Sequence, residues 1–405
     1  MPPAAEPTSP ASPVAPPGPS KKPEDTPFKQ QRLPAWQPIM SPKWVIGCFL
    51  ILGPLFIGVG VAIVLASDSV VEIEVRYDHK QPCPWSARST GPSYRCTPFT
   101  SQFTVPKVMQ QPVFMYYKLE NFYQNHRLYA KSVSDSQLSG GSPGADPSDC
   151  SPRKTVGETV NLNQNSWTNI VRYLATGGQP TAGITATDVN LNNVMYNPCG
   201  LIAWSQFNDT FKLTKPTGPD AGLICDGGAF DVLGNPTPGV LQKCVKRGIA
   251  WPSDPGVRFA APLDQGSQTL TYRGWEVEPS TDGSPWASHV QNGWYVGEPG
   301  HKIPNPQDED FMVWMRLASL SSFRKLYRKI TVDLQPGAYE LEVAEAFDVS
   351  SFKGKKSFVL STSSWIGGKN YFLAGMYIAV GSLCLILGAA FFFKFWTTPR
   401  RIGAI

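Results

Sequence analysis

The chain has 405 residues and a formal net charge of +5, from 36 Lys and Arg against 31 Asp and Glu. No basic run in its central region is interleaved with aromatic residues, so this modest charge does not predict nucleic-acid binding. The hydrophobic residues, 41% of the chain, include two long uninterrupted runs, which argue against an ordinary soluble protein.

The region before the first apolar run has two parts. Residues 1–27 are dominated by Pro, Ala and Ser, a composition that cannot bury enough apolar surface to fold, so they predict a disordered tail. Residues 28–43 form a juxtamembrane segment whose Trp36 suits the aromatic belt at a membrane surface. So long a polar leader is not typical of a cleaved signal peptide, and the apolar run that follows is expected to be its own signal anchor.

Residues 44–67 and 371–393 are predicted to be transmembrane helices. Each run exceeds the roughly 20 residues needed to cross a hydrocarbon core about 30 Å thick, and neither contains an acidic or basic residue. A buried helix of a soluble protein would normally be shorter and polar on one face. Basic residues gather at the terminal side of both runs, so both tails, including residues 394–405, are predicted to be cytoplasmic and residues 68–370 exoplasmic.

The exoplasmic region is predicted to be mainly β. After the first span, apolar Val71, Ile73 and Val75 alternate with charged residues, which is typical of a half-buried strand. Further strands are expected at residues 113–119, 311–317, 339–343 and 356–361. Residues 323–330 instead have apolar side chains at helical spacing and favour a short helix, with a strand as the alternative. The predicted fold is two transmembrane α-helices plus a large disulfide-stapled domain resembling an antiparallel β-sandwich with long loops.

The cysteines divide between the two environments. Cys48 and Cys384 lie inside the predicted spans, where a thiol behaves as a small apolar group. The other six lie in the exoplasmic region, where an oxidising compartment favours disulfides: Cys83, Cys96, Cys150, Cys199, Cys225 and Cys244. Six cysteines allow fifteen pairings, so pairing between neighbours is only the simplest expectation. A zinc site is the rival interpretation, but no CxxC pair or histidine cluster supports it.

The sequence contains no credible catalytic, metal or cofactor site. Ser142 lies in a GxSxG pattern, but its Ser, Gly and Pro-rich surroundings predict a loop rather than the strand–turn–helix elbow of a hydrolase. The four histidines lack metal-ligand spacing. Asn208 begins the one permitted sequon of the exoplasmic region, because proline spoils the triplet at Asn235, and it is predicted to carry a glycan.

The two predicted spans carry small residues at four-residue spacing. These are Gly58 with Ala62 in the first span and Gly375 with Ala379 in the second, with Gly381 and Gly388 further along. Such faces let membrane helices approach closely, although membrane helices also tolerate glycine without any partner. No ionisable residue marks an ion path through either span. A surface for docking a membrane partner is the better interpretation.

Several longer strings follow one another between Phe28 and the second span. They are residues 29–38 (KQQRLPAWQP), 114–117 (FMYY), 121–126 (NFYQNH), 135–138 (DSQL), 198–200 (PCG), 207–210 (FNDT), 248–251 (GIAW), 310–316 (DFMVWMR), 323–328 (FRKLYR) and 364–370 (SWIGGKN). These strings closely resemble the family of cell division control protein fifty and ligand-effect modulator, the accessory β-subunits of phospholipid flippases. Only the two tails fall outside the resemblance.

The resemblance implies a non-catalytic subunit of a type-four P-type ATPase in a secretory-pathway membrane, needed for the ATPase to leave the endoplasmic reticulum and turn over. It implies that Cys83 pairs with Cys96 and Cys150 with Cys199, and that Asn208 is a family glycosylation site. Cys225 and Cys244 have no counterpart in the family, so their pairing with each other is expected only because they are the two exoplasmic cysteines that remain. The spans, with Arg32 and Trp36 at the cytoplasmic membrane edge, are expected to contact the ATPase and membrane lipids.

A cell-surface receptor or adhesion protein is the alternative function. In that case the exoplasmic domain would bind an external ligand and the spans would serve only as anchors. Recovery of a large ATPase, as opposed to soluble ligands alone, distinguishes the two.

Overall fold

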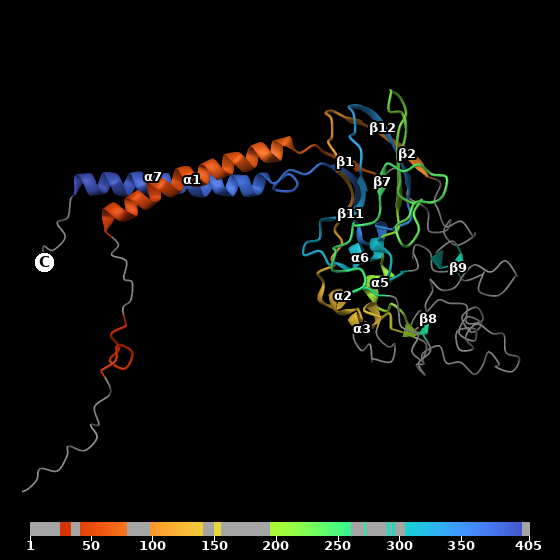
Figure 1. Cartoon of the computed structure of the whole chain (residues 1–405), viewed down its shortest axis with the longest axis horizontal. Coiled ribbons are helices and arrows are strands. Elements are labelled where there is room, and N and C mark those ends of the chain that lie inside the picture. Colours follow the sequence, from red (N-terminus) through yellow and green to blue (C-terminus); the bar gives the residue numbers. More distant parts are fainter. Residues whose placement is uncertain are drawn as a thin grey trace, which may run out of the picture. The chain divides into compact units, whose positions relative to one another are not determined.

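The computed structural model describes residues 25–33, 41–78, 98–140, 150–154, 195–260, 271–272, 290–291, 294–295 and 304–398. Two long helices, α1 (Pro42–Ser69) and α7 (Tyr371–Thr397), contain the two predicted apolar runs in full, and strands occupy the chain between them (Figure 1). Both helices are long and apolar enough to cross a membrane by length and composition.

The larger sheet, called sheet A, is antiparallel and has the strand order β1-β13-β3-β11-β7. Its strands are β1 (Glu72–Arg76), β13 (Lys355–Ser361), β3 (Val113–Glu120), β11 (Phe323–Ile330) and β7 (Cys244–Val245). In the central strand β3, buried Val113, Met115, Tyr117 and Leu119 alternate with partly exposed residues. One face of sheet A is therefore turned to the core.

The second sheet, called sheet B, is also antiparallel, with the order β2-β12-β5-β6. Its strands are β2 (Phe99–Val105), β12 (Gly337–Ala344), β5 (Thr210–Lys215) and β6 (Gly222–Asp226). Aromatic side chains fill the space between the sheets: the ring of Phe211 in β5 lies 5.2 Å from that of Phe358 in β13 and 5.1 Å from that of Tyr327 in β11. This packing confirms the predicted sandwich-like fold class.

The first and last strands of the sandwich pair with each other. Glu72 in β1 stands opposite Ser361 in β13, and the pairing continues through five residues to Arg76 opposite Ser357. Just beyond it, the Val71 amide donates to Thr362 Oγ1 at 2.9 Å, and the Thr362 amide donates to the Val71 carbonyl at 3.0 Å. The chain therefore passes from α1 into the domain, and from the domain into α7, at one edge of sheet A.

Short elements complete the described part of the domain. The helices are α2 (Arg127–Lys131), α3 (Asp135–Leu138), α5 (Leu201–Trp204), α6 (Glu309–Met315) and the 3-10 turn η7 (Ser350–Phe352). Two-residue strands form a parallel pair, β4 (Met195–Tyr196) with β8 (Thr271–Tyr272), and an antiparallel pair, β9 (Val290–Gln291) with β10 (Trp294–Tyr295).

The predicted strands at 113–119, 339–343 and 356–361 are confirmed as β3, β12 and β13, but the strand predicted at 311–317 is wrong. That segment lies in helix α6, where buried Phe311, Met312, Trp314 and Met315 follow a helical rather than an alternating period. Asp308 begins the helix because its side chain accepts a hydrogen bond from the Asp310 amide at 2.8 Å. A short apolar run does not by itself distinguish a strand from a helix.

The helix favoured at 323–330 is also wrong, because the segment forms strand β11. Its pairing with β3 shifts between Leu326 and Arg328, so Tyr327 is an extra residue in a β-bulge. Tyr327 and Arg328 are therefore both buried, which breaks the alternation. The bulge places apolar residues at intervals of three and four, which imitates a helical period.

Lys325 in β11 joins this strand to the end of α6. Its ammonium group donates to the carbonyl oxygens of Val313 at 3.1 Å, Trp314 at 3.0 Å and also Arg316, where the helix leaves carbonyls without intrahelical partners. Only 7% of Lys325 is exposed, and burial lowers the pKa of its amine to about 7.

Replacing Lys325 is predicted to change the pH dependence of stability. A lysine pKa of about 7 in the folded protein, against roughly 10.4 when unfolded, means that the unfolded chain binds more protons between these values. The free energy of unfolding of the natural protein should therefore rise by about 2 kcal/mol relative to Lys325→Met between pH 7 and pH 9. Denaturant unfolding of both proteins in detergent measures this difference. If the difference in free energy of unfolding between the two proteins did not change from pH 7 to pH 9, the three carbonyls would be shown to keep Lys325 charged.

Candidate partner-binding interface

The small residues predicted to bind a partner lie on exposed surfaces of α1 and α7. Gly58, Ala62, Gly375 and Ala379 are all exposed. A Cβ atom added to Gly58 or Gly375 would meet no atom within 4 Å. These two pairs, here called the outer faces, are therefore not used to pack the chain against itself.

A different set of glycines brings α1 and α7 together, and Figure 1 shows the two helices side by side. A Cβ on Gly53 would lie 2.6 Å from Leu385 Cγ, and one on Gly381 would lie 2.7 Å from the Gly53 carbonyl oxygen. A Cβ on Gly388 would lie 3.1 Å from Leu50 Cδ2. At Gly381 a side chain would collide with the backbone of α1, at Gly53 it would collide with the Leu385 side chain, and at Gly388 it would displace Leu50 slightly.

The sequence analysis named Gly381 and Gly388 of this contact, here called the inner seam, but assigned all the small residues to partner docking, although a signal for the seam exists. Its buried members recur every seven residues, at Ile46, Gly53 and Gly60 in α1 and at Ala374, Gly381 and Gly388 in α7. Seven-residue spacing is typical of helices that pack along a common seam. The four-residue spacing chosen from the sequence identified the outer faces instead.

The cytoplasmic segment is described only in part. Arg32 is exposed, and its amide donates to the Pro27 carbonyl at 2.7 Å in a turn. Trp36 lies outside the described residues. The expected contact of these two residues with a partner therefore remains a prediction.

A buried ion cluster fixes the segment after the predicted glycosylation site. Asp209 accepts hydrogen bonds from Tyr77 Oη at 2.8 Å, from the amides of Ala346 and Phe347 at 2.5 and 2.6 Å, and from Lys356 Nζ at 2.8 Å. Lys356 also contacts Glu345 Oε1 at 2.9 Å. Burial and the Asp209 carboxylate raise the pKa of the Tyr77 phenol. The cluster connects the end of β1 and the start of β5 to β13. Removing one member would leave an uncompensated buried charge, which is costly, so the cluster holds these strands together.

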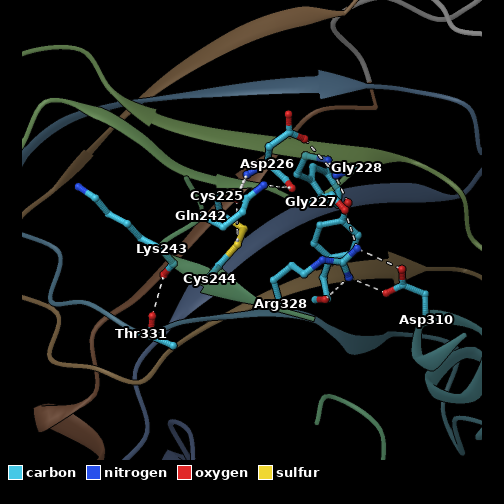
Figure 2. Close-up of a disulfide and its surroundings, with 12 residues drawn as sticks. Cys225, Asp226, Gly227, Gly228, Gln242, Lys243, Cys244, Asp310, Arg328 and Thr331 are labelled. Carbon is cyan, nitrogen blue, oxygen red and sulfur yellow. Dashed lines mark hydrogen bonds and ion pairs between the residues drawn. A yellow bond between two sulfur atoms is a disulfide. The ribbon is translucent and has the colours of Figure 1, made fainter. Parts of the chain in front are cut away.

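A second charged network lies beside β11. Arg328, only 2% exposed, contacts both carboxylate oxygens of Asp310, at 2.6 and 3.1 Å, and donates to the Gly227 carbonyl at 2.5 Å (Figure 2). Lys246 contacts Asp308 at 2.8 Å and Asp310 at 3.2 Å. Burial disfavours the charges of Arg328 and Lys246, but the carboxylates outweigh it and hold both pKa values above their usual range.

Two of the three expected cysteine pairs are formed among the described residues. Cys150 is joined to Cys199, and Cys225 is joined to Cys244 with a Cα–Cα distance of 5.4 Å. Cys83 and Cys96 lie outside the described residues. Gly200 directly follows Cys199 in the chain. Its φ is +101°, and a Cβ atom there would lie 2.1 Å from the Ser132 carbonyl oxygen. The backbone can pass this point only as glycine.

The Cys225–Cys244 bond connects the two sheets. Cys225 is in β6, at the edge of sheet B, and Cys244 is in β7, at the edge of sheet A. Backbone bonds run beside it, from the Lys243 amide to the Ile224 carbonyl at 3.0 Å and from the Thr331 amide to the Lys243 carbonyl at 2.9 Å. Figure 2 shows the bond next to the Arg328 and Asp310 pair. The disulfide therefore clamps one edge of the sandwich.

The structure describes only some of the remaining candidates from the sequence. Asn208 is 5% exposed. Ser142, the centre of the GxSxG pattern, and three of the four histidines lie outside the described residues, while His126 is exposed. Among the residues that the structure does describe, no group of three His, Cys, Asp or Glu side chains is arranged to hold a metal ion.

Comparison with known proteins places the chain in one family. The family model described as LEM3 (ligand-effect modulator 3) family / CDC50 family matches residues 63–401. ALA-interacting subunit 3 of Arabidopsis thaliana is 37% identical over 95% of this chain and 89% of its own length. Cell cycle control protein 50A of Bos taurus is 37% identical over 91% and 88% of the two chains. Phospholipid-transporting ATPase accessory subunit CDC50 of Chaetomium thermophilum is 27% identical over 95% of this chain and 90% of its own length.

Removing the inter-sheet disulfide is predicted to destabilise the domain. Cys225 and Cys244 are separated by 19 positions, and a loop of this length gives a disulfide contribution of about 3 kcal/mol on the chain-entropy model. The double variant Cys225→Ala/Cys244→Ala should therefore melt well below the natural protein when thermal unfolding is followed in detergent. The matched control is Cys48→Ala/Cys384→Ala, which removes two free thiols. Equal melting of the two double variants would contradict a clamping role.

Proposed function

Because the chain belongs to the LEM3/CDC50 family, we propose that it is the non-catalytic accessory subunit of a phospholipid-transporting P-type ATPase. The observation that carries the proposal is the match, over more than nine-tenths of the chain, to proteins named as accessory or interacting subunits. The ATPase would carry out ATP hydrolysis and lipid movement from the exoplasmic to the cytoplasmic leaflet. This chain would support its folding, its exit from the endoplasmic reticulum and its activity.

We propose that the two subunits form a heterodimer within a membrane of the secretory pathway, namely the endoplasmic reticulum, Golgi or endosome, or plasma membrane. Both termini would be cytoplasmic and the sandwich exoplasmic, as the basic residues next to the spans predict. The two apolar helices support a membrane location. Asn208 would carry a glycan on the exoplasmic side.

The outer faces are the part of the chain that best suits docking in a membrane. In lipid, association of helices depends on close packing, because the lipid tails are as apolar as the side chains. Gly58 and Gly375 leave space at the surface of α1 and α7, whereas the inner seam is already filled. A partner helix could therefore approach the outer faces closely without disturbing the pairing of α1 with α7.

Docking would affect the partner in two ways. Binding only to the folded ATPase stabilises it by mass action, which explains a role in its maturation. A preference for one reaction intermediate would shift the ATPase cycle by the difference in affinity between intermediates and by no more than that. The proposal therefore assigns no chemical step to this chain.

Co-expression with a type-four P-type ATPase tests the proposal. We expect the ATPase to co-purify stoichiometrically in detergent, to leave the endoplasmic reticulum and to hydrolyse ATP only when the chain is present. Gly58→Ile/Gly375→Ile should reduce co-purification at least about tenfold, a loss of about 1.4 kcal/mol, because side chains would fill the outer faces.

The control is Leu52→Phe, which enlarges an exposed apolar side chain about 120° around the same helix. It should leave co-purification unchanged. Normal export and turnover of the ATPase without the chain would overturn the proposal. Recovery of soluble ligands alone would favour a receptor.

A further inference from the structure

A cavity of about 430 Å³ opens beside β5 and β11. Its wall combines aromatic residues such as Tyr117, Phe207 and Phe230 with charged residues of the Arg328 and Lys246 network. Pockets for small organic ligands typically measure roughly 300–1,000 Å³ and combine these two kinds of wall. The cavity is therefore large enough for one or two sugar rings.

Asn208, the asparagine of the sequon, lines this cavity. Its backbone is held from both sides: the Phe207 ring stacks on Tyr117 with centroids 3.8 Å apart, and Asp209 is fixed by the buried ion cluster. Because Asn208 is 5% exposed, a group attached to its side chain has little open surface on which to lie. The cavity is the space adjoining it.

The charges in the wall favour an uncharged polar ligand. Arg328 is paired with Asp310, and Lys246 is paired with Asp308 and Asp310, so an added anion would compete with carboxylates already in place. Asp231 at the rim holds Asn235 through both carboxylate oxygens, at 2.7 and 2.8 Å. Carboxylate and carbonyl oxygens can still accept hydrogen bonds from hydroxyl groups.

One buried donor in the wall lacks an acceptor. Arg328 Nε is buried and has no hydrogen-bond partner among the described residues, although the other guanidinium nitrogens are bonded. The guanidinium group lies 5.2 Å from the centroid of the Phe230 ring, also in the wall. An unpaired buried donor is costly, and an acceptor oxygen on a ligand would remove that cost.

We propose that this cavity holds the core N-acetylglucosamine of a glycan attached to Asn208, with the rest of the glycan leaving through the opening. The inference rests on the predicted glycosylation of Asn208, which would take place before folding while the sequon is still extended. The N-acetyl sugar is uncharged, carries hydroxyl donors and acceptor oxygens, and has an apolar ring face for the aromatic wall. The glycan would then act as a structural part of the sandwich.

Protection from peptide-N-glycosidase F tests the position of the sugar. The full-length protein is digested natively and after denaturation, and conversion of Asn208 to Asp is followed by glycopeptide mass spectrometry. We expect release from the native protein to be at least tenfold slower than from the denatured protein. Phe230→Ala should restore rapid release, because it removes part of the wall, whereas Leu241→Ala, a change at a residue 91% exposed and outside the cavity, should not.

A second measurement separates a seated sugar from simple burial of the asparagine. Endoglycosidase H leaves the first N-acetylglucosamine on the chain, so trimming folded protein that carries high-mannose glycans should leave its Tm unchanged. Thr210→Val keeps the shape of the side chain but abolishes the sequon, and it should lower Tm by about 2–4 °C relative to Thr210→Ser, which keeps it.

The opposite results would overturn the proposal. These are an unmodified Asn208, equal rates of native and denatured release, no effect of Phe230→Ala on release, and equal Tm values for the two Thr210 variants. A lower Tm after endoglycosidase H treatment of the folded protein would show that the outer sugars, rather than the core sugar, stabilise the fold.

Discussion

The pairing of β1 with β13 is the constraint on which the rest of the structure depends. These strands directly follow α1 and directly precede α7, so their register fixes where the domain leaves one helix and enters the other. Hydrogen bonds between Ser67 Oγ and the Asn370 amide at 3.2 Å, and from Tyr371 Oη to Asp68 Oδ1 at 2.7 Å, continue the junction into the helix ends. The end of α1 and the start of α7 therefore meet beside this strand pair.

The sandwich is held by buried polar groups as well as by its aromatic core. One group consists of Asp209, Lys356 and Glu345 and the other of Arg328, Asp310 and Lys246, and both border the same cavity. Buried ion pairs add little net stability compared with apolar packing, but breaking one is costly, so they penalise alternative arrangements. The Cys225–Cys244 bond acts beside the second group and joins β6 and β7, the edge strands of different sheets. Such a cross-link increases the stability of a domain with long connections, because it lowers the conformational entropy of the unfolded chain.

In the two long helices, the glycines at the contact between α1 and α7 differ from those left at the surface. Gly53, Gly381 and Gly388 build the inner seam, while Gly58 and Gly375 remain at the surface. A membrane helix pair that used all its small residues on itself would have no close-packing face left for a partner. This arrangement fits an accessory subunit, whose function is to stay bound to another membrane protein.

Composition and hydropathy by themselves determined the two apolar helices, the mainly β character between them and the strands at 113–119, 339–343 and 356–361, since these signals are local in the chain. Tertiary contacts decided the rest. An N-cap at Asp308 and a buried face turned residues 309–315 into a helix, and a bulge at Tyr327 made β11 look helical. The ion cluster around Asp209 depends on residues far apart in sequence, so no local pattern can reveal it. Neighbour pairing anticipates the Cys225–Cys244 bond and seven-residue spacing is a signal for the inner seam, but only the folded chain shows that these residues meet, because the fold alone brings their atoms together.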